Sequence, residues 1–473
     1  MEDEDDRNAQ TDAGLTRKKS RRRSIFKIVK SMNIKLKLLI VFVILVHCVM
    51  VISRLVATGM AKHRLIRMHN VMIFSTAMLF TSVYMWRRVN FSLRHLLPTP
   101  SEVGNRRLRK ICFQDVALAF FTLFIFLAHI AMMFFYVLLG SEPSFIALTS
   151  LSFLAAYLHI LIFLLLADAI LFTFYTIHEK VVTNSVYLYL HRNRSYHIFL
   201  AVLIGFMFMF GGLYATQTDP TVRRRDVQMK TFKSHSNTSI VLLSDIHIGP
   251  SVGRTRMQRI VEITNSLKPD IIAIAGDLAD GMVNDFHEAA EPLCNLTAPG
   301  GVYFATGNHE YMHGNITEWF WFLERCNIKI LHNSNKHVTI KNEKFCIAGA
   351  DDLYAERVHI PGHGMNMSAA LSTCNADSTN ILLAHQPNAA RIVIDDPVLS
   401  KKVNLILSGH THGGQMYPWV PLVKIANAYL RGLYYDSRTD TYVYVSAGVN
   451  YFGPPIKMFK SCEIILLNLL SKN

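Results

Sequence analysis

Long apolar stretches fill the first half of the chain, whereas short apolar runs separated by polar turns fill the second half. Five of the long stretches approach or exceed the roughly 20 residues that an apolar helix needs to cross a bilayer. We therefore predict membrane spans at residues 38–57, 68–86, 116–139, 145–166 and 198–214. Buried helices of a soluble protein are the alternative, but such helices carry a polar stripe. The stretch 120–139 has only single polar residues, scattered over all its faces.

Positive charges flank the predicted spans and indicate their orientation. Lysine and arginine are dense before the first span and after the second, and the connection 140–143 has neither. The positive-inside rule then places the N-terminus in the cytoplasm, and five spans place the second half of the chain in a lumen or outside the cell. Basic residues at 62–67 and 223–225 oppose this orientation. One missed or additional span would also invert it.

Composition supports a membrane protein, because 51% of the residues are hydrophobic. The net charge of +15 could also suggest nucleic-acid binding. The positive residues, however, gather beside the predicted spans, so we expect the lipid bilayer as a partner and do not expect nucleic acid. The predicted organisation is a charged cytoplasmic tail (1–37), an α-helical multi-pass membrane domain of about five helices (38–217), a linker (218–238) and a second domain (239–473).

In the second domain, five short apolar runs predict strands, at 240–243, 271–275, 302–305, 381–383 and 403–407. A polar turn follows each run. Open α/β sheets bind ligands at the carboxyl ends of their strands, so we expect the side chains of these turns to meet there. The candidate site residues in these turns are Asp245, His247, Asp277, Asn308, His309, His385, His410 and His412.

These residue types favour a site for divalent metals. Carboxylate, amide oxygen and imidazole suit Mn, Fe, Zn or Mg, and a carboxylate such as Asp277 can bridge two cations. A single Asp or His at a strand end is commonly only a turn. Two histidines that alternate between glycines, as in 409–414 (GHTHGG), have no evident packing role. Five such turns in order therefore indicate a site for two divalent metal cations.

From about Ser239 to Leu469 the sequence resembles the calcineurin-like metallophosphoesterase superfamily. The resemblance rests on the five turns, and the segments 349–352 and 448–463 resemble its membrane-associated bacterial and animal members. It implies an α/β domain of two facing mixed sheets flanked by helices, with the metal site at one edge. It also implies these roles: Asp245, His247 and His412 on one metal, Asn308, His385 and His410 on the other, Asp277 bridging, and His309 as the catalytic histidine.

Two positions depart from the commonest pattern of the superfamily. Glu310 stands where many members have Asp, and it can still orient His309 or its loop through a longer reach. Lys457 lies near the position where related bacterial sequences have an arginine. A lysine there would hold a phosphate less specifically than a bidentate arginine.

The resulting hypothesis is a membrane-anchored phosphoesterase that hydrolyses a phosphodiester or phosphomonoester by attack of a hydroxide bridging the metals. Confinement near a bilayer favours a lipid-linked substrate. The alternative is a non-catalytic metal-binding scaffold that recruits partners at a membrane. A transporter is a third hypothesis, because the long apolar run that begins at 145 contains the ionisable residues His159 and, near its end, Asp168, although no polar pair is evident from the sequence.

Cysteines and glycosylation sequons bear weakly on the side of the membrane. Of the seven cysteines, the five at 294, 326, 346, 374 and 462 could form up to two disulfides or none. Sequons at Asn237, Asn295, Asn315 and Asn366 agree with a luminal or extracellular domain. Further sequons at Asn90 and Asn193 fall in predicted cytoplasmic connections.

Overall fold

The computed structural model describes residues 33–97, 113–135, 144–178, 185–232, 237–313 and 315–471. The chain forms two compact units, and the division falls inside helix α3, between Phe74 and Ser75. Most of the predicted charged tail (1–32), the end of the third predicted span (136–139) and part of the predicted linker (233–236) lie outside the described residues.

The first unit contains α2 (Ile34–Val56) and the beginning of α3 (Gly59–Leu96). Its main polar contact joins the two helices through His69. A ring nitrogen of His69 lies 3.0 Å from His47, and the other lies 2.9 Å from Arg54. Helix α2 begins inside the predicted tail, because it starts at Ile34.

The remaining helices of the membrane half belong to the second unit. They are α4 (Phe113–Ile130), α5 (Phe145–His178), α6 (Ser185–Arg192) and α7 (Arg194–Gln217). Within the described residues, four segments are long and apolar enough to cross a membrane: Lys37–Val56, Phe113–Phe134, Phe145–Ile177 and Arg194–Gln217.

These four segments coincide with four of the five predicted spans. The other predicted span, 68–86, is helical but belongs to α3, whose full length is much more polar. His69 and Asn70 lie at one end of that stretch, and Arg87 and Arg88 follow its other end. The described residues therefore supply four membrane-length apolar helices, one fewer than predicted.

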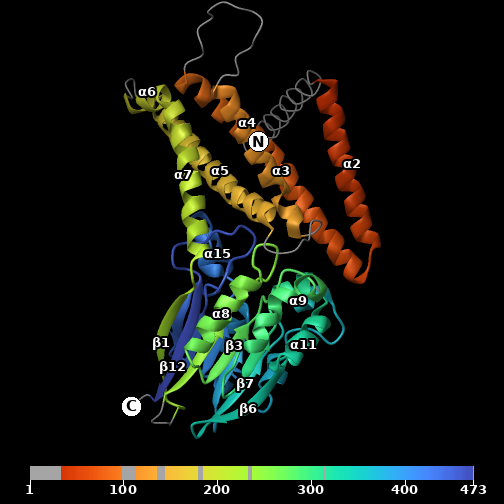
Figure 1. The fold of residues 1–473 in the computed structure, drawn as a ribbon, viewed down its shortest axis with the longest axis vertical. Helices are drawn as coiled ribbons and strands as arrows, with labels where there is room; N and C mark the ends of the chain where they lie inside the picture. The colour runs from red at the N-terminus through yellow and green to blue at the C-terminus, as the bar shows by residue number, and fades with distance from the viewer. Residues whose placement is uncertain are drawn as a thin grey trace, which may run out of the picture. The chain divides into compact units, whose positions relative to one another are not determined.

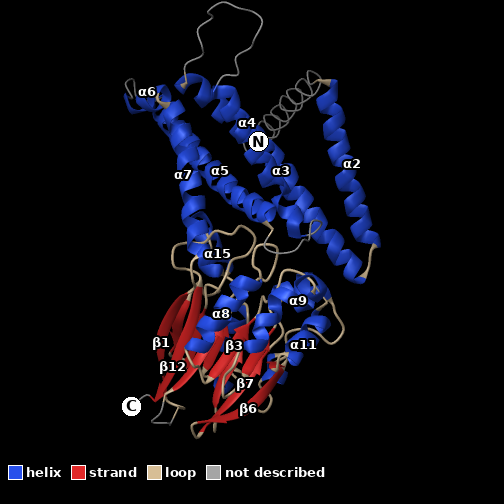
Figure 2. Cartoon of the chain, in the orientation of Figure 1, coloured by secondary structure: helices blue, strands red, loops and turns tan. Residues whose placement is uncertain are grey.

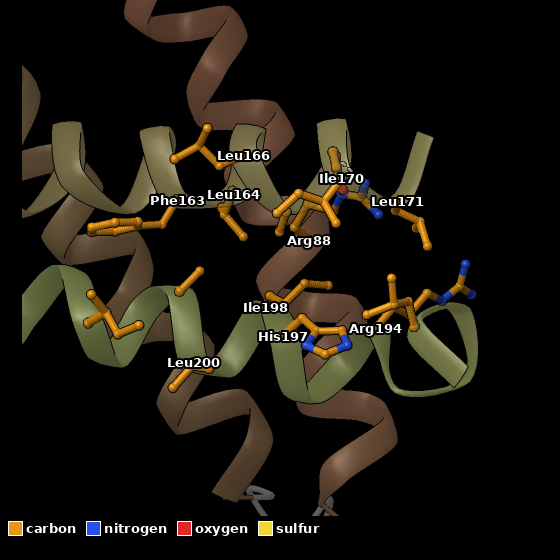
Figure 3. A pocket seen from close by; sticks show the side chains of 15 residues that line it. Arg88, Phe163, Leu164, Leu166, Ile170, Leu171, Arg194, His197, Ile198 and Leu200 are labelled. Atoms are coloured by element: carbon orange, nitrogen blue, oxygen red, sulfur yellow. Dashed lines mark hydrogen bonds and ion pairs between the residues drawn. The ribbon is translucent and has the colours of Figure 1, made fainter. Parts of the chain in front are cut away.

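Asp168 lies within α5 and not near its end, because the helix continues well beyond the predicted boundary. Its carboxylate accepts a hydrogen bond of 2.7 Å from Tyr84 and pairs with the guanidinium of Arg88, both from α3. A largely apolar pocket of about 330 Å³ lies beside this ion pair, and Arg88, Arg194 and His197 are among the residues that line it (Figure 3). The charge of Asp168 thus has a partner on a neighbouring helix.

The second domain contains two six-stranded mixed sheets with helices on their outer faces, as predicted (Figure 2). The first sheet has the order β1 (Thr221–Met229), β12 (Glu463–Ser471), β2 (Thr238–Leu243), β3 (Ile271–Ala275), β4 (Val302–Ala305), β5 (Ile328–Ile330). The second has the order β10 (Gly432–Asp436), β11 (Thr441–Val445), β9 (Leu405–Ser408), β8 (Thr379–Leu383), β7 (Glu343–Gly349), β6 (Ser334–Ile340).

The central strands of both sheets are buried on both faces, as parallel strands covered by helices require. Ile240 and Leu242 of β2 pack between the sheets with Ile381 and Leu383 of β8. Outside the sheets lie α8 (Arg254–Ser266), α9 (Val283–Ala290), α10 (Asn308–His313), α11 (Ile316–Arg325), α12 (Ala355–Val358), α13 (Met367–Ala370), α14 (Pro387–Asp395) and α15 (Val420–Ala426). Figure 1 shows α8, α9 and α11 together on one side of the sheets.

The predicted linker 218–238 is wrong in part, because it contains the edge strand β1. β1 pairs in parallel with β12, with Thr221 opposite Glu463 and Met229 opposite Ser471. The strand is not evident from the sequence, because three successive arginines interrupt the alternation of apolar and polar residues. Charged side chains are common on edge strands, where they discourage pairing with other chains.

Candidate metal centre

The structure brings the eight predicted site residues to one edge of the sheets, in the segments that directly follow β2, β3, β4, β8 and β9. Among these residues, three groups of side chains each offer ligand atoms that lie within 4.8 Å of one another. They are Asp245, His247 and His412; His247, Asp277 and His309; and Asp277, His385 and His410. His247 and Asp277 each belong to two of the groups, so the three groups are contiguous.

Strained backbone holds many of these side chains. Positive φ angles occur at Asp245 (54°), His247 (50°), Asp277 (55°), His410 (72°) and His412 (50°). Residues other than glycine rarely adopt this left-handed conformation, which costs roughly 1–3 kcal/mol when other interactions impose it. Such strain is typical of functional loops, where it aims side chains at one point.

Two glycines allow the loops to approach closely. A Cβ atom on Gly307 would overlap the carboxylate of Asp277, and a Cβ on Gly409 would overlap Ser244 and the carboxylate of Asp245. Any side chain at either position would therefore push a predicted ligand out of place.

The first predicted metal position lies among Asp245, His247 and His412. Nδ1 of His247 lies 2.8 Å from the Asp280 carboxylate, which can only accept a hydrogen bond, so Nδ1 carries the proton and donates it. Nε2 of His247 then has a free lone pair. That Nε2 lies 3.1 Å from Nε2 of His412, which in turn lies 3.4 Å from Asp245 Oδ1. The backbone N–H of His410 donates to Asp245 at 2.9 Å and fixes its carboxylate.

The second predicted position lies among Asp277, Asn308, His385 and His410. Nδ1 of His385 donates to the Ala275 carbonyl at 2.7 Å, so Nε2 faces Asp277 Oδ2 at 3.1 Å. Oδ1 of Asn308 lies 2.8 Å from Nδ1 of His410. Each imidazole is thus oriented by its neighbours, as expected for a metal ligand.

The donor set fits divalent cations in chemistry, and His410 and His412 fit them in protonation as well. Burial lowers the pKa of His410 to about 4, and His385 adds to the effect. Burial also lowers the pKa of His412 well below its ordinary value, with His247 adding to the effect. Both histidines are therefore neutral near pH 7, which is the state that coordinates a metal. The pKa of His385 is instead raised well above its ordinary value, because the effect of burial is outweighed by the Asp277 carboxylate. Nε2 of His385 and Nδ1 of His412 are buried and have no hydrogen-bond partner within the described residues.

Asp280 is a site residue that the sequence analysis missed. A single oxygen, Oδ1, lies 2.8 Å from Nδ1 of His247 and 2.7 Å from Nδ1 of His309. Burial would raise the pKa of Asp280, but the two histidines hold it well below its ordinary value. Burial would likewise lower the pKa of His309, yet Asp277 and Asp280 raise it to about 9. The sequence did offer one signal for Asp280, because it lies three residues after Asp277 in the same turn.

We expect Asp280→Asn to lower kcat by about 10–100-fold and to weaken metal binding by a similar factor. The amide keeps the size of the side chain but removes the charge that orients His247 and His309. Titration with Mn²⁺ and steady-state kinetics measure the two effects, and KM should stay within about twofold if Asp280 acts through these histidines. An unchanged kcat at saturating metal would contradict this role.

Glu310 orients the loops of the site and does not face a metal position. Its carboxylate accepts backbone N–H bonds from Gly307 (2.6 Å), Leu278 (2.7 Å) and Asp277 (3.1 Å). These bonds tie the turn after β3 to the turn after β4. The prediction that Glu310 can orient the loop of His309 therefore has a specific structural basis.

Lys457 supports the closing loop and is not available to hold phosphate. Its Nζ is buried and donates to the carbonyls of Ala447, Gly448 (3.0 Å) and Asn450 (2.6 Å), which uses all three N–H bonds. The predicted contact between Lys457 and phosphate is therefore wrong. Phe452 of the same loop reaches the site, with its ring centroid 4.6 Å from that of His309.

Two facing mixed sheets, with Asp, Asn and His side chains clustered at the carboxyl ends of their strands, define the class of metallophosphoesterases. Residues 238–414 match the calcineurin-like phosphoesterase family. A Caenorhabditis elegans protein named for a metallophosphoesterase, F40B5.2, is 63% identical over 93% of this chain and 97% of its own length. The chain belongs to the calcineurin-like phosphoesterase family.

Two further relatives are named transmembrane protein with metallophosphoesterase domain. The protein of Danio rerio is 34% identical over 85% of this chain and 89% of its own length, and that of Bos taurus is 34% identical over 86% and 90%. The predicted resemblance to membrane-associated members of the family is confirmed. These names give a family and a membrane association but no substrate.

Proposed function

We propose that this chain is a multi-pass membrane phosphoesterase that uses two divalent cations to hydrolyse a phosphodiester or phosphomonoester. The observation that carries the proposal is Asp277. Its buried carboxylate lies 3.1 Å from His385 in one group of ligand atoms and 3.7 Å from His247 in the other. A carboxylate in this position suits a bridge between two cations.

In this proposal, Asp245, His247 and His412 would hold one cation, Asn308, His385 and His410 would hold the other, and Asp277 would serve both. Bound cations supply charge neutralisation at the phosphate and activation of a water nucleophile. Water adds to phosphorus as the bond from phosphorus to the leaving oxygen breaks. The chain's own residues fix the geometry of this exchange through the hydrogen bonds to Asp245, His247 and His385.

His309 is the proposed proton donor to the leaving oxygen. Its Nδ1 contacts Asp280, which leaves Nε2 directed toward Asp277, with Nε2 3.9 Å from Oδ2. The pKa of about 9, raised by Asp277 and Asp280 against the effect of burial, favours the protonated imidazole that an acid needs. Phe452 packs against the ring and limits its rotation.

The decisive experiment uses the full chain in detergent, supplied with Mn²⁺ and either 4-nitrophenyl phosphate or 4-nitrophenyl methyl phosphate. We expect hydrolysis of at least one ester, its loss on chelation with EDTA and its return with Mn²⁺. The preferred ester identifies the class of substrate. A folded protein that holds two metals per chain and hydrolyses neither ester would favour the scaffold alternative.

The proposed location of the phosphoesterase domain is luminal or extracellular. Two disulfides, Cys294–Cys326 and Cys346–Cys374, support an oxidising compartment. The asparagines of the four sequons in this domain, at 237, 295, 315 and 366, are exposed. From a cytoplasmic N-terminus, this location needs an odd number of crossings, so α3 would cross the membrane together with the four apolar helices.

The proposed substrate is lipid-linked. Association with a bilayer raises the local concentration of lipid-borne esters around the metal centre. A preference for lipid-linked over soluble esters with the same scissile bond is the expected result, and equal rates for the two would contradict it.

A further inference from the structure

A pocket of about 340 Å³ lies between the membrane helices and the loops beside the metal centre. Its walls come from α5 and α7 on one side, and from 415–417 and 456–459 on the other. The volume falls within the usual range of ligand sites. Met207, Phe208, Met416 and Ile456 make its lining largely apolar.

The contacts around this pocket join α7 directly to the phosphoesterase domain. Thr216 of α7 donates to the carbonyl of Pro455 at 2.6 Å, and the N–H of Lys457 donates to the carbonyl of Gly212 at 3.3 Å. A Cβ atom on Gly212 would overlap Ile456, so glycine permits this approach. The pocket is therefore built by fixed contacts between the helix and the closing loop.

A short wall separates the pocket from the metal centre. Gln415, which lines the pocket, follows the predicted ligand His412 by three residues. Its side chain donates to the carbonyls of Phe452 (2.9 Å) and Pro454 (3.2 Å) and accepts from the N–H of Phe452 (3.1 Å). Phe452 contacts His309 on its other side.

Exposed apolar side chains surround the same region. Among the described residues of the phosphoesterase domain, eight large hydrophobic side chains are exposed. Four of them belong to the pocket wall or to the adjoining α15: Tyr417, Leu422, Ile425 and Phe459. Ile425 is 83% exposed. A soluble domain seldom gathers such residues unless the surface meets lipid or a ligand, and this surface adjoins the membrane-length helix α7.

We propose that this pocket binds the alkyl or acyl chain of an amphiphilic phosphate ester, with the ester directed over Gln415 toward the metal centre. The inference rests on the proposed function for the chemistry, and it adds the place where the substrate's chain lies. The occupant is a lipid because the walls are apolar, the rim is exposed and apolar, and one wall is a membrane-length helix. Gln415 and Phe452 limit how closely the alkyl chain of the substrate can approach the metal centre.

Gly211 provides a direct test, because it lines the pocket and a Cβ atom there would meet nothing within 4 Å. Gly211→Trp places a large side chain at the pocket from a position where its Cβ meets no wall atom, and Gly211→Ala adds only a methyl group. Phe210→Trp is the matched control, since Phe210 is 63% exposed and does not line the pocket. Gly211→Leu serves as a smaller blocking variant, and thermal unfolding of each full-length variant checks its fold.

The binding measurement uses hexadecyl phosphate with a diazirine at the end of its chain, cross-linked by light and mapped by peptide mass spectrometry. We expect labelling of peptides containing 207–214 or 456–459, and about tenfold less labelling in Gly211→Trp than in Phe210→Trp. Equal labelling in these two folded variants would overturn the pocket, whether or not the chain is a hydrolase.

The kinetic measurement compares 4-nitrophenyl hexadecyl phosphate with 4-nitrophenyl methyl phosphate, which share the scissile bond. We expect Gly211→Trp to lower the ratio of their kcat/KM values about tenfold. An unchanged ratio in Gly211→Trp would count against the pocket as a substrate site. Labelling without hydrolysis of any ester would instead overturn the proposed function and leave the lipid pocket in place.

Discussion

Asp277→Asn should lower metal-dependent hydrolysis by at least about a thousandfold. The Asp277 carboxylate is 2% exposed and lies among His247, His309 and His385. An amide has the same shape, but it has no charge and only one oxygen, so it cannot bridge two cations. The rate of ester hydrolysis and the metal content of the purified chain, measured by inductively coupled plasma mass spectrometry, should fall together.

Asp377→Asn is the matched control for this prediction, because it makes the same chemical change at an exposed position. Both variants should remain folded, which thermal unfolding can check. If Asp277→Asn kept two tightly bound metals and more than a tenth of its activity, the bridging role would be wrong.

The positions of the ligand loops could be predicted from the sequence because each follows a short run of apolar residues in a strand. β3 and β8 are buried along their whole length, and the end of each apolar run marks where its polar turn begins. Parallel strands bring their carboxyl ends to one edge, so side chains distant in sequence, such as Asp245 and His410, were expected to meet.

The backbone geometry of those loops was not predictable from local preferences. Asp245, His247, Asp277, His410 and His412 adopt positive φ, which their residue types disfavour. Their conformation is imposed by tertiary contacts, such as the N–H bonds that Glu310 accepts from two loops. Asp280 was missed for a related reason, because only the folded structure brings His247 and His309 to one carboxylate oxygen.

The edge strand β1 and the ion pair of Asp168 were missed because their partners are remote in sequence. β1 has no apolar alternation to reveal it, and its partner β12 follows more than two hundred residues later. Asp168 appeared to be an isolated charge until α3 supplied Arg88. Elements that bury apolar side chains leave a pattern in their own sequence, whereas pairings with a distant segment leave none.

Loss of the Cys294–Cys326 disulfide should destabilise the phosphoesterase domain by about 3–4 kcal/mol, the entropy that a crosslink of this span removes from the unfolded chain. The bond joins the end of α11 to a turn 32 residues earlier, beside the core of the first sheet. The variant Cys294→Ser/Cys326→Ser should therefore unfold roughly 10 °C lower in temperature than the unaltered chain. Cys48→Ser is the control, since Cys48 is free and exposed.

The same cysteines test the side of the membrane on which the domain lies. Disulfides persist in a lumen or outside the cell and are reduced in the cytosol. Peptide mapping of protein taken from native membranes, after alkylation without reductant, should recover Cys294 joined to Cys326 and Cys346 joined to Cys374. Recovery of all four as free, alkylated thiols would place the domain in the cytosol, with an even number of crossings and with α3 outside the count.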